Sequence, residues 1–285
     1  MSIEVSIKQK GIFRKPLPLD VILGKSLKYG NYDGFRLDFD KLGETEFVAY
    51  HPGHIGRGIT VTWKQGEKNA VDLRLLTPAS DEEMEDFYEC IARIVRFWKN
   101  SVVEVEGVPK SLEECLEEKE DLLKGNQSFI ANLFGEMINR GQVPLVLPCA
   151  FWSISLSEED LQRVSQGSAS FRDYMHEKQN MDVYYAKPIF CKDEQGVFGT
   201  YACTEETESI FPAKAAPPFW ADKSLQVYRW EIALFSTTED AIVGTVDYEQ
   251  FLKSVPEDKK QPYDADHLLI APLDLTLLKQ IAGQI

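Results

Sequence analysis

The stretch that decides the fold is VDLRLLTPASDEEMEDFYECIARIVRFW, residues 71–98. Its first six residues mostly alternate apolar and charged side chains, which is the two-residue period of a half-buried strand. A Thr-Pro-Ala turn interrupts this pattern. Ser80 and Glu83 then have the Ser-x-x-Glu spacing of a capping box, which satisfies backbone N–H groups at the start of a helix. Apolar residues recur at three- and four-residue steps as far as Trp98, as on one face of a helix. The stretch therefore predicts an α+β protein.

Short strands are expected before this stretch. Glycine-rich turns separate several apolar runs in the first seventy residues, which favours antiparallel hairpins packed with helices. The helix that ends near Trp98 is followed by a short run rich in β-branched residues, which favours a further strand. The expected strands are residues 3–7, 34–39, 47–50, 58–64 and 102–106.

A second capping box opens an acidic helix. Ser111 and Glu114 have the same spacing as the first pair, and the helix is expected to stop at Gly125 and resume over residues 129–139. This interruption suggests a lobe boundary near Lys124. We therefore expect an N-terminal α+β lobe, residues 1–124, and a C-terminal α+β lobe, residues 125–285, with a single domain as the alternative.

The C-terminal half contains a similar order of elements. A strand, a helix, a strand and a helix are expected near its end, as they are over residues 71–123. One hypothesis is a duplication that gives two similar lobes, and the alternative is a chance resemblance of short elements. The expected elements are residues 226–235, 247–255, 267–270 and 273–281. Upstream of them, an apolar strand is expected at 143–149, helices from Ser157 and over 170–178, and a hairpin that turns at 193–196.

The net charge excludes some classes of partner. The 285 residues include 46 acidic and 31 basic side chains, for a formal charge of −15. A field of this sign repels phosphate groups, so we expect no nucleic-acid and no membrane binding. A local basic patch within residues 8–36 would be the exception, and solvated loop and strand faces are the alternative. The patch would contain Lys8, Lys10, Arg14, Lys15, Lys25, Lys28 and Arg36.

The expected location is the cytoplasm. The N-terminus alternates like a strand and lacks the apolar core of a signal peptide. The longest uncharged run, residues 141–157, contains two prolines and is too short to span a membrane. The five cysteines are odd in number and show no C-x-x-C spacing, which argues against a disulfide framework. Cys90 and Cys115 are expected on apolar helix faces as buried thiols.

The densest cluster of polar residues and glycines is HPGHIGRG, residues 51–58. His51 and His54 can bind a metal ion, and Arg57 with exposed backbone N–H groups can bind an anion. However, the two histidines lack further ligands at metal-site spacing. The glycines also match neither a P-loop nor a dinucleotide-binding fingerprint. A glycine turn between strands is the alternative, and we predict no metal set and no cofactor.

No catalytic set is evident. Asp264, Asp266 and His267 place two carboxylates beside an imidazole, but such groups act as acid and base only when they converge. An acidic turn that leads into a strand explains them equally well. No cysteine lies near a histidine and a cation, and no serine lies in a nucleophile elbow. We therefore predict no catalytic residue.

Two surfaces are candidates for partner binding. Residues 81–124 hold fourteen acidic and six basic side chains. Such an acidic helical face can bind a basic protein partner, and solvated helix faces are the alternative. The loop Pro217–Trp220 carries Phe219 and Trp220, which can anchor a partner or cover the core.

Residues 75–88, LLTPASDEEMEDFY, resemble a group of uncharacterised cytoplasmic proteins of low-GC Gram-positive bacteria, catalogued as a full-length domain of unknown function. The resemblance implies no activity and no catalytic residue. The leading hypothesis is a non-catalytic cytoplasmic interaction protein. The alternative is an enzyme or small-ligand binder with a site near His51, His54 and Arg57, and nucleic-acid binding is the third hypothesis.

Overall fold

The computed structural model describes residues 1–217 and 224–283, and the chain divides into two compact units, residues 1–181 and 182–285. Helices and mostly antiparallel strands are both abundant in the described residues, which confirms the α+β prediction. Phe219 and Trp220, the predicted partner anchors, lie outside the described residues.

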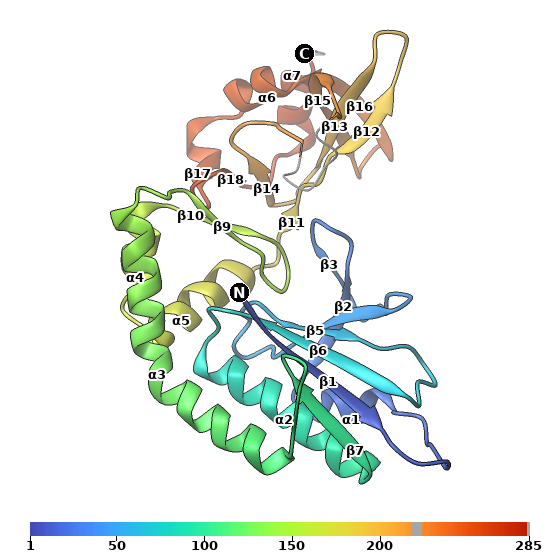
Figure 1. The fold of residues 1–285 in the computed structure, drawn as a ribbon. Helices are drawn as coiled ribbons and strands as arrows, with labels where there is room; N and C mark the ends of the chain where they lie inside the picture. Colours follow the sequence, from blue (N-terminus) through green and yellow to red (C-terminus); the bar gives the residue numbers. More distant parts are fainter. Residues whose placement is uncertain (218–223, 284–285) are drawn as a thin grey trace. The chain divides into compact units, whose positions relative to one another are not determined.

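An eight-stranded antiparallel sheet forms the centre of the first unit (Figure 1). Its strand order is β3-β2-β4-β5-β6-β1-β7-β8, so the N-terminal strand lies between β6 and β7. The strands are β1 (Ser2–Gln9), β2 (Lys28–Tyr32), β3 (Leu37–Phe39), β4 (Glu46–Tyr50), β5 (Ile59–Thr62), β6 (Ala70–Leu76), β7 (Ser101–Val105) and β8 (Val108–Lys110).

Strand β2 is not among the strands that the sequence predicts. Its sequence, KYGNY, contains glycine and asparagine, which normally indicate a turn. A Cβ on Gly30 would lie 2.5 Å from Cγ of Leu37 on the neighbouring β3, so this strand needs a glycine for the close approach.

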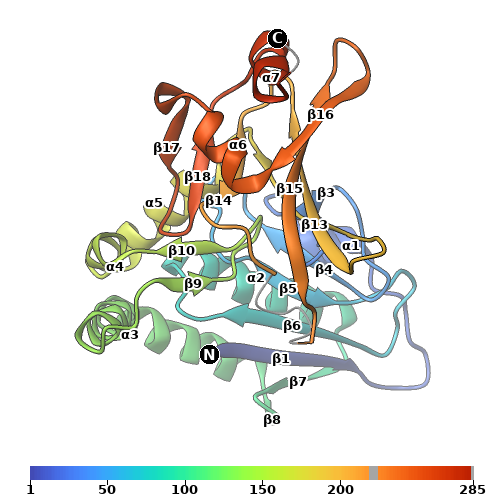
Figure 2. The same cartoon turned by 90° about the horizontal axis from the view of Figure 1, so that it is seen from above.

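The two faces of this sheet differ in chemistry. On β1, Val5 and Ile7 are buried, whereas Glu4 and Ser6 point to the opposite face. Helix α2 (Asp81–Trp98) packs on one face of the sheet (Figure 2). This is the apolar face, and the side chains of α2 complete the main core of the unit. Both halves of the predicted capping box of α2 are present.

Helix α3 (Leu112–Asn139) is continuous, so the predicted stop at Gly125 is wrong. Glycine and asparagine are poor helix formers, but the neighbouring Asn126 has a tertiary role. Its buried Nδ2 donates hydrogen bonds to the carbonyl oxygen of Ala79 at 3.0 Å and to Oδ1 of Asp81 at 2.7 Å. The division of the chain after residue 181 therefore differs from the boundary expected near Lys124, which lies inside this helix.

Shorter elements complete the first unit. Ser157 caps a helix as its sequence predicted, with a capping box to Asp160. The remaining elements are α1 (Leu19–Leu23), β9 (Leu145–Leu147), β10 (Ile154–Leu156), α4 (Glu158–Val164) and α5 (Ser168–Gln179).

The second unit has two four-stranded sheets with its own core. The strand orders are β12-β13-β15-β16 and β11-β14-β18-β17, and the hairpin predicted around residues 193–196 joins β12 to β13. The elements are β11 (Tyr184–Tyr185), β12 (Ile189–Lys192), β13 (Val197–Thr204), β14 (Ser209–Pro212), β15 (Val227–Ser236), β16 (Ala241–Asp247), α6 (Tyr248–Ser254), η1 (Glu257–Lys259), β17 (Lys260–Pro262), β18 (His267–Ile270) and α7 (Leu275–Ile281).

The two segments that suggested a duplication have different topologies. In the first unit, β6 and β7 both pair with β1 in one sheet. In the second unit, β15 and β18 belong to different sheets, and β16, which the sequence analysis missed, follows β15. The similar order of elements therefore does not produce two similar lobes.

The cysteines are all free, as their spacing predicted, and Cys90 and Cys115 are buried. Burial raises the pKa of the Cys90 thiol to about 12. Within residues 1–217 and 224–283, no helix is both long and apolar enough to cross a membrane.

Candidate functional site

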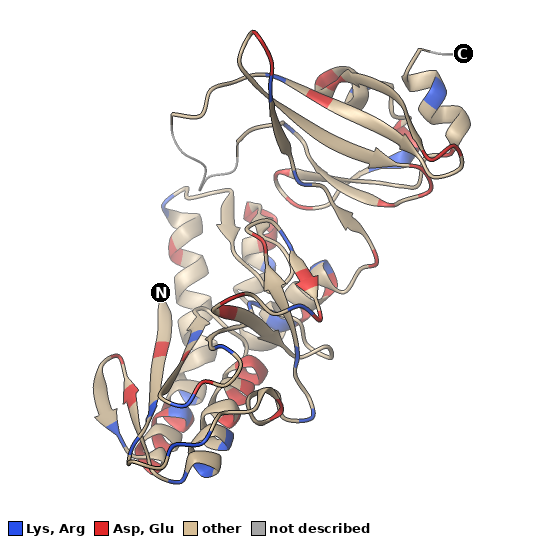
Figure 3. Cartoon of the chain, turned by 90° about the vertical axis from the view of Figure 1, so that its right-hand side faces the viewer, with Lys and Arg blue, Asp and Glu red and all other residues tan. Residues whose placement is uncertain are grey.

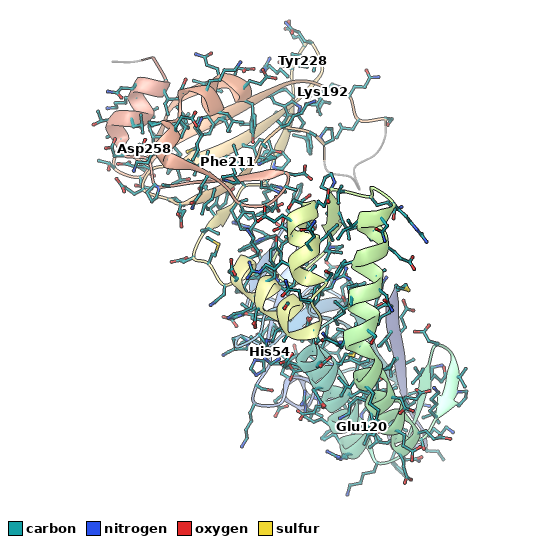
Figure 4. The ribbon with its side chains drawn as sticks, turned by 90° about the vertical axis from the view of Figure 1, so that its left-hand side faces the viewer. His54, Glu120, Lys192, Phe211, Tyr228 and Asp258 are labelled. Atoms are coloured by element: carbon teal, nitrogen blue, oxygen red, sulfur yellow. The ribbon has the colours of Figure 1, made fainter. Side chains whose placement is uncertain are left out.

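The predicted histidine pair comes together in the loop between β4 and β5. The rings of His51 and His54 stack with centroids 3.9 Å apart and planes 8° apart. Nε2 of His54, the residue labelled in Figure 4, lies 2.7 Å from Oδ2 of Asp86 on α2. Nδ1 of His51 accepts a hydrogen bond from the backbone N–H of Gly53. Burial, and then the neighbouring His54, lower the pKa of His51, and Asp86 opposes this shift.

Arg57 has a structural role. Its side chain is 7% exposed, and its Nε and Nη1 donate to the carbonyl oxygens of Pro148 and Thr77, each at 3.0 Å. The backbone N–H groups of Arg57 and Gly58 donate to Oε1 of Glu83 at 2.6 and 2.9 Å. Burial raises the pKa of Glu83, and its backbone hydrogen bonds oppose this shift. Glu83 thus ties the glycine loop to the first turn of α2.

Residues distant in sequence complete the contacts of this loop. Ile55 donates its backbone N–H to Nδ1 of His176 on α5 at 3.0 Å, and Gln179 donates to the carbonyl oxygen of Gly56 at 2.8 Å. A Cβ on Gly56 would lie 2.2 Å from Oε2 of Glu83, so only glycine fits against the carboxylate. The cavity beside the two stacked histidines measures about 10 Å³, which is room for about one water molecule.

Among the described residues, the two histidines are not part of a group that could bind a metal ion. Nowhere in the described part of the chain are three or more His, Cys, Asp or Glu side chains grouped so that they could hold a metal ion. The loop over residues 51–58 therefore carries a hydrogen-bonded His54–Asp86 pair in a closely packed structural junction.

The solvent-facing side of the eight-stranded sheet is hollowed. A depression of about 390 Å³ lies over the strands β1, β4, β5, β6 and β7. Charged and hydroxyl side chains dominate its lining, and they come from the polar positions of alternating strands. They include Glu4, Ser6, Glu46, Thr60, Thr62, Asp72, Arg74, Glu104 and Glu106.

The register of the strands aligns five of these side chains in one row across the sheet, here called the acidic row: Glu46, Thr62, Asp72, Ser6 and Glu104. Glu46 is opposite Thr62, Thr62 is opposite Asp72, and Asp72 is opposite Ser6, which is in turn opposite Glu104. Carboxylates therefore alternate with hydroxyls. Because neighbouring strands are about 4.8 Å apart, successive carboxylates of the row are about 10 Å apart.

The acidic row is only partly neutralised. Lys8 pairs with Glu104 at 2.6 Å, and in the neighbouring row Arg74 lies 3.4 Å from Glu4. Glu46 and Asp72 are exposed, and neither has an ion-pair or hydrogen-bond partner for its side chain among the described residues. This surface is not among the sequence predictions, although the alternation of polar residues along each strand is its visible signal.

The acidic side chains of the predicted helical face lie in different environments. Glu83 is buried, Asp86 binds His54, and Glu85 pairs with Lys119 at 2.8 Å. On the first half of α3, where Figure 4 labels Glu120, Glu113 and Glu117 are exposed and have no side-chain partner among the described residues. We call Glu113 and Glu117 the α3 pair.

The second unit also joins residues that the sequence left apart. Oδ1 of Asp264 accepts hydrogen bonds from the backbone N–H and from Nδ1 of His267, each at 2.8 Å. Nε2 of His267 lies 3.0 Å from the hydroxyl oxygen of Tyr185. With Nδ1 donating, Nε2 accepts the Tyr185 proton. Asp264 and His267 therefore do converge, and Tyr185 is the member that the sequence did not indicate.

The fold and these surfaces define an α+β protein whose main sheet is covered by a helix on one face and is open and charged on the other. The family model described as "Domain of unknown function (DUF4299)" matches residues 2–281, nearly the whole chain, so the chain belongs to this family. No curated protein and no solved structure matches the chain.

Proposed function

We propose that this protein is a non-catalytic interaction protein and that it binds a basic segment of a protein partner on the open face of its main sheet. The observation that carries the proposal is the acidic row, in which Glu46 and Asp72 have no partner among the described residues. The hollow of about 390 Å³ at this face gives a binding segment a concave surface.

The spacing of the row indicates the kind of segment. Its carboxylates are about 10 Å apart, close to one three-residue turn of a polyproline II segment at about 3.1 Å per residue, in which every third side chain lies on the same side. Lysine or arginine side chains that point to the same side at a similar spacing would each meet a carboxylate. The hydroxyls of Thr62 and Ser6 lie between these positions and can bond the polar backbone of the segment.

Affinity at such a surface requires several contacts. An exposed ion pair contributes about 0.2–1 kcal/mol, so one pair alone is too weak to hold a partner. Complementary charge also accelerates association, and salt weakens it. We therefore expect binding that depends on the number of cations in the segment and that falls steeply as salt is added.

The α3 pair is the competing acidic surface. Glu113 and Glu117 are also exposed and also lack partners among the described residues, but they lie on the outside of a helix. Substitutions at the two surfaces are matched in number and in charge. They therefore separate a specific site from general acidity.

The test is fluorescence anisotropy with a labelled peptide that carries lysine or arginine at every third position. We expect the wild-type chain to bind it and the double variant Glu46→Gln/Asp72→Asn to bind about fivefold more weakly, from about 0.5 kcal/mol for each of two ion pairs. The matched variant Glu113→Gln/Glu117→Gln should retain wild-type affinity. Equal affinity of all three proteins, or a loss only in the α3 variant, would refute the proposed site.

The alternative function, an enzyme or small-ligand binder near His51, His54 and Arg57, has less support. The cavity there has room for about one water molecule, and the Arg57 guanidinium is bonded to carbonyl oxygens. A cytoplasmic location in a low-GC Gram-positive bacterium is also part of the proposal. It rests on the free cysteines and on the resemblance of residues 75–88.

A further inference from the structure

Two large apolar side chains project from one end of the first unit. Ile12 is 94% exposed and Phe13 is 97% exposed, and they are adjacent in the loop between β1 and α1. Single exposed apolar residues are common on protein surfaces. Two adjacent ones at the tip of a loop form a larger apolar surface, which a binding partner would bury.

The loop itself is held in place by the side chain of Gln9, which is 4% exposed. Its Nε2 donates to the carbonyl oxygens of Lys15 and Lys68, both at 2.9 Å, and its Oε1 accepts the backbone N–H of Lys15 at 3.0 Å. The indole N–H of Trp98 also donates to the carbonyl oxygen of Lys15 at 3.2 Å. The fold therefore presents Ile12 and Phe13 on an anchored loop.

Basic residues from three segments surround this loop. Backbone hydrogen bonds of 2.8 Å join Gln9 to Asn69 and Lys10 to Asn100. They bring the loop at residues 64–69 and the end of α2 to the same end of the sheet as the tip. The exposed basic residues there, coloured blue with the others in Figure 3, are Lys8, Lys10, Arg14, Lys15, Lys64, Lys68, Arg96 and Lys99. Three acidic residues lie among or beside them: Glu67, Asp72, which lines one depression with Lys64 and Glu67, and Glu104, which pairs with Lys8.

We propose that this end of the first unit, the basic tip, docks on an anionic lipid surface. Ile12 and Phe13 would enter the interfacial layer while the surrounding cations contact the headgroups, the pattern that binds peripheral proteins to acidic membranes. A projecting apolar tip enters a lipid layer without a preformed pocket. A protein partner would need a pocket shaped for both side chains and rimmed with acids.

The overall charge of the chain does not prevent this docking. At physiological salt, exposed charges more than about 8 Å apart are largely screened. The carboxylates beyond that distance therefore weaken the attraction only slightly, and the local field at the tip is positive. The proposal departs in this respect from the expectation of no membrane contact, which rested on the summed charge of the chain.

The experiment is cosedimentation of the full chain with phosphatidylcholine vesicles that contain or lack phosphatidylserine. We expect binding only to the vesicles with phosphatidylserine, and loss of that binding in high salt. The variant Ile12→Ser/Phe13→Ser should bind at least tenfold more weakly, because two apolar side chains no longer leave water. The variant Lys10→Gln/Lys99→Gln should lose about fivefold for each cation removed.

A control for the loss of an exposed apolar side chain comes from the second unit. Ile242 is 62% exposed and follows Glu239 and Asp240 in the sequence, where Glu239 pairs with Lys279, so Ile242→Ser removes an exposed apolar side chain outside the basic tip. This variant should bind vesicles as the wild type does. All these positions are exposed, so the variants should keep the fold.

Soluble polyanions distinguish the other classes of partner. Polyglutamate and single-stranded DNA offer negative charge without an apolar layer. Vesicle binding that depends on Ile12 and Phe13, with weaker binding to both polymers, supports the proposal. Absence of binding to phosphatidylserine vesicles, equal loss in the Ile242→Ser control, or tighter binding to either polymer would overturn it.

Discussion

Glu83 illustrates how much of this structure depends on single side chains. The sequence identifies it as the third helical residue of a capping box, and that role is confirmed. Its carboxylate also accepts the backbone N–H groups of Arg57 and Gly58, which lie 26 and 25 residues away. A local spacing rule cannot reveal such contacts, because they depend on where a distant loop packs.

The first residue-scale prediction concerns Gly56. Its φ is outside the left-handed region, so the variant Gly56→Ala is strained only by contact of the new Cβ with the Glu83 carboxylate. Overpacking of this kind costs typically about 1–3 kcal/mol. We expect the free energy of unfolding, measured in urea, to fall by that amount. An unchanged value would show that the loop does not pack against Glu83.

The second concerns Glu205, whose carboxylate accepts hydrogen bonds from Ser236 and Thr238. These bonds lower its pKa from 4.5 to about 2. The folded state therefore binds fewer protons than the unfolded state between these values. The resulting stability is fully present above pH 4.5 and is lost as the pH falls toward 2.

We therefore expect the melting temperature of Glu205→Gln to lie below that of the wild type above pH 4.5, with a difference that shrinks in more acidic solution. Thermal unfolding followed by circular dichroism over this pH range is the measurement. A difference that does not change with pH would contradict the role assigned to Glu205.

The histidine loop shows the limit of sequence reasoning at this scale. The three-residue spacing of His51 and His54 predicts that the two imidazoles act together, and their rings stack. Their surroundings were not predictable, because His54 binds Asp86 and the loop binds His176, 32 and 121 residues away. The burial of Arg57 could not be predicted either, because its glycine-rich segment resembles an exposed turn.

At the scale of elements, the signals at helix starts were reliable and the signal for a helix end was not. The capping boxes at Ser80, Ser111 and Ser157 are all present. They are local patterns whose hydrogen bonds form within one turn. Gly125 failed as a stop signal because tertiary hydrogen bonds of the next residue hold the helix in place.

The continuity of α3 can be tested at Gly125 itself. A Cβ there would meet no atom within 4 Å, and its φ is not left-handed. Alanine in a helix interior is favoured over glycine by about 1 kcal/mol. We expect Gly125→Ala to raise the free energy of unfolding in urea by about that amount, the opposite sign to Gly56→Ala. Destabilisation would indicate that the helix breaks at this residue.

Strand β16 was missed for a related reason. Gly244 interrupts its apolar pattern, and glycine normally weakens a strand. A Cβ at this position would lie 2.5 Å from Cβ of Ala282, just beyond the end of α7, so the glycine permits the close packing of that segment on the sheet. This contact depends on a residue 38 positions later in the chain.

At the scale of the whole molecule, the α+β class was predictable because alternation and helical periodicity are properties of short windows. The acidic row was not. Its members come from five strands between residues 6 and 104, and only the order β4-β5-β6-β1-β7 brings them side by side. Strand order depends on packing. The sequence therefore indicates that the chain is acidic, but not which carboxylates lie together on the sheet.

Carboxylate footprinting tests the central claim most directly. The chain would be treated with a carbodiimide and an amine, with and without the bound basic peptide, and the modified residues located by mass spectrometry. The acidic row predicts reduced modification of Glu46 and Asp72 when the peptide is bound, and unchanged modification of Glu113 and Glu117. Protection of the α3 pair, with Glu46 and Asp72 still fully reactive, would contradict the account.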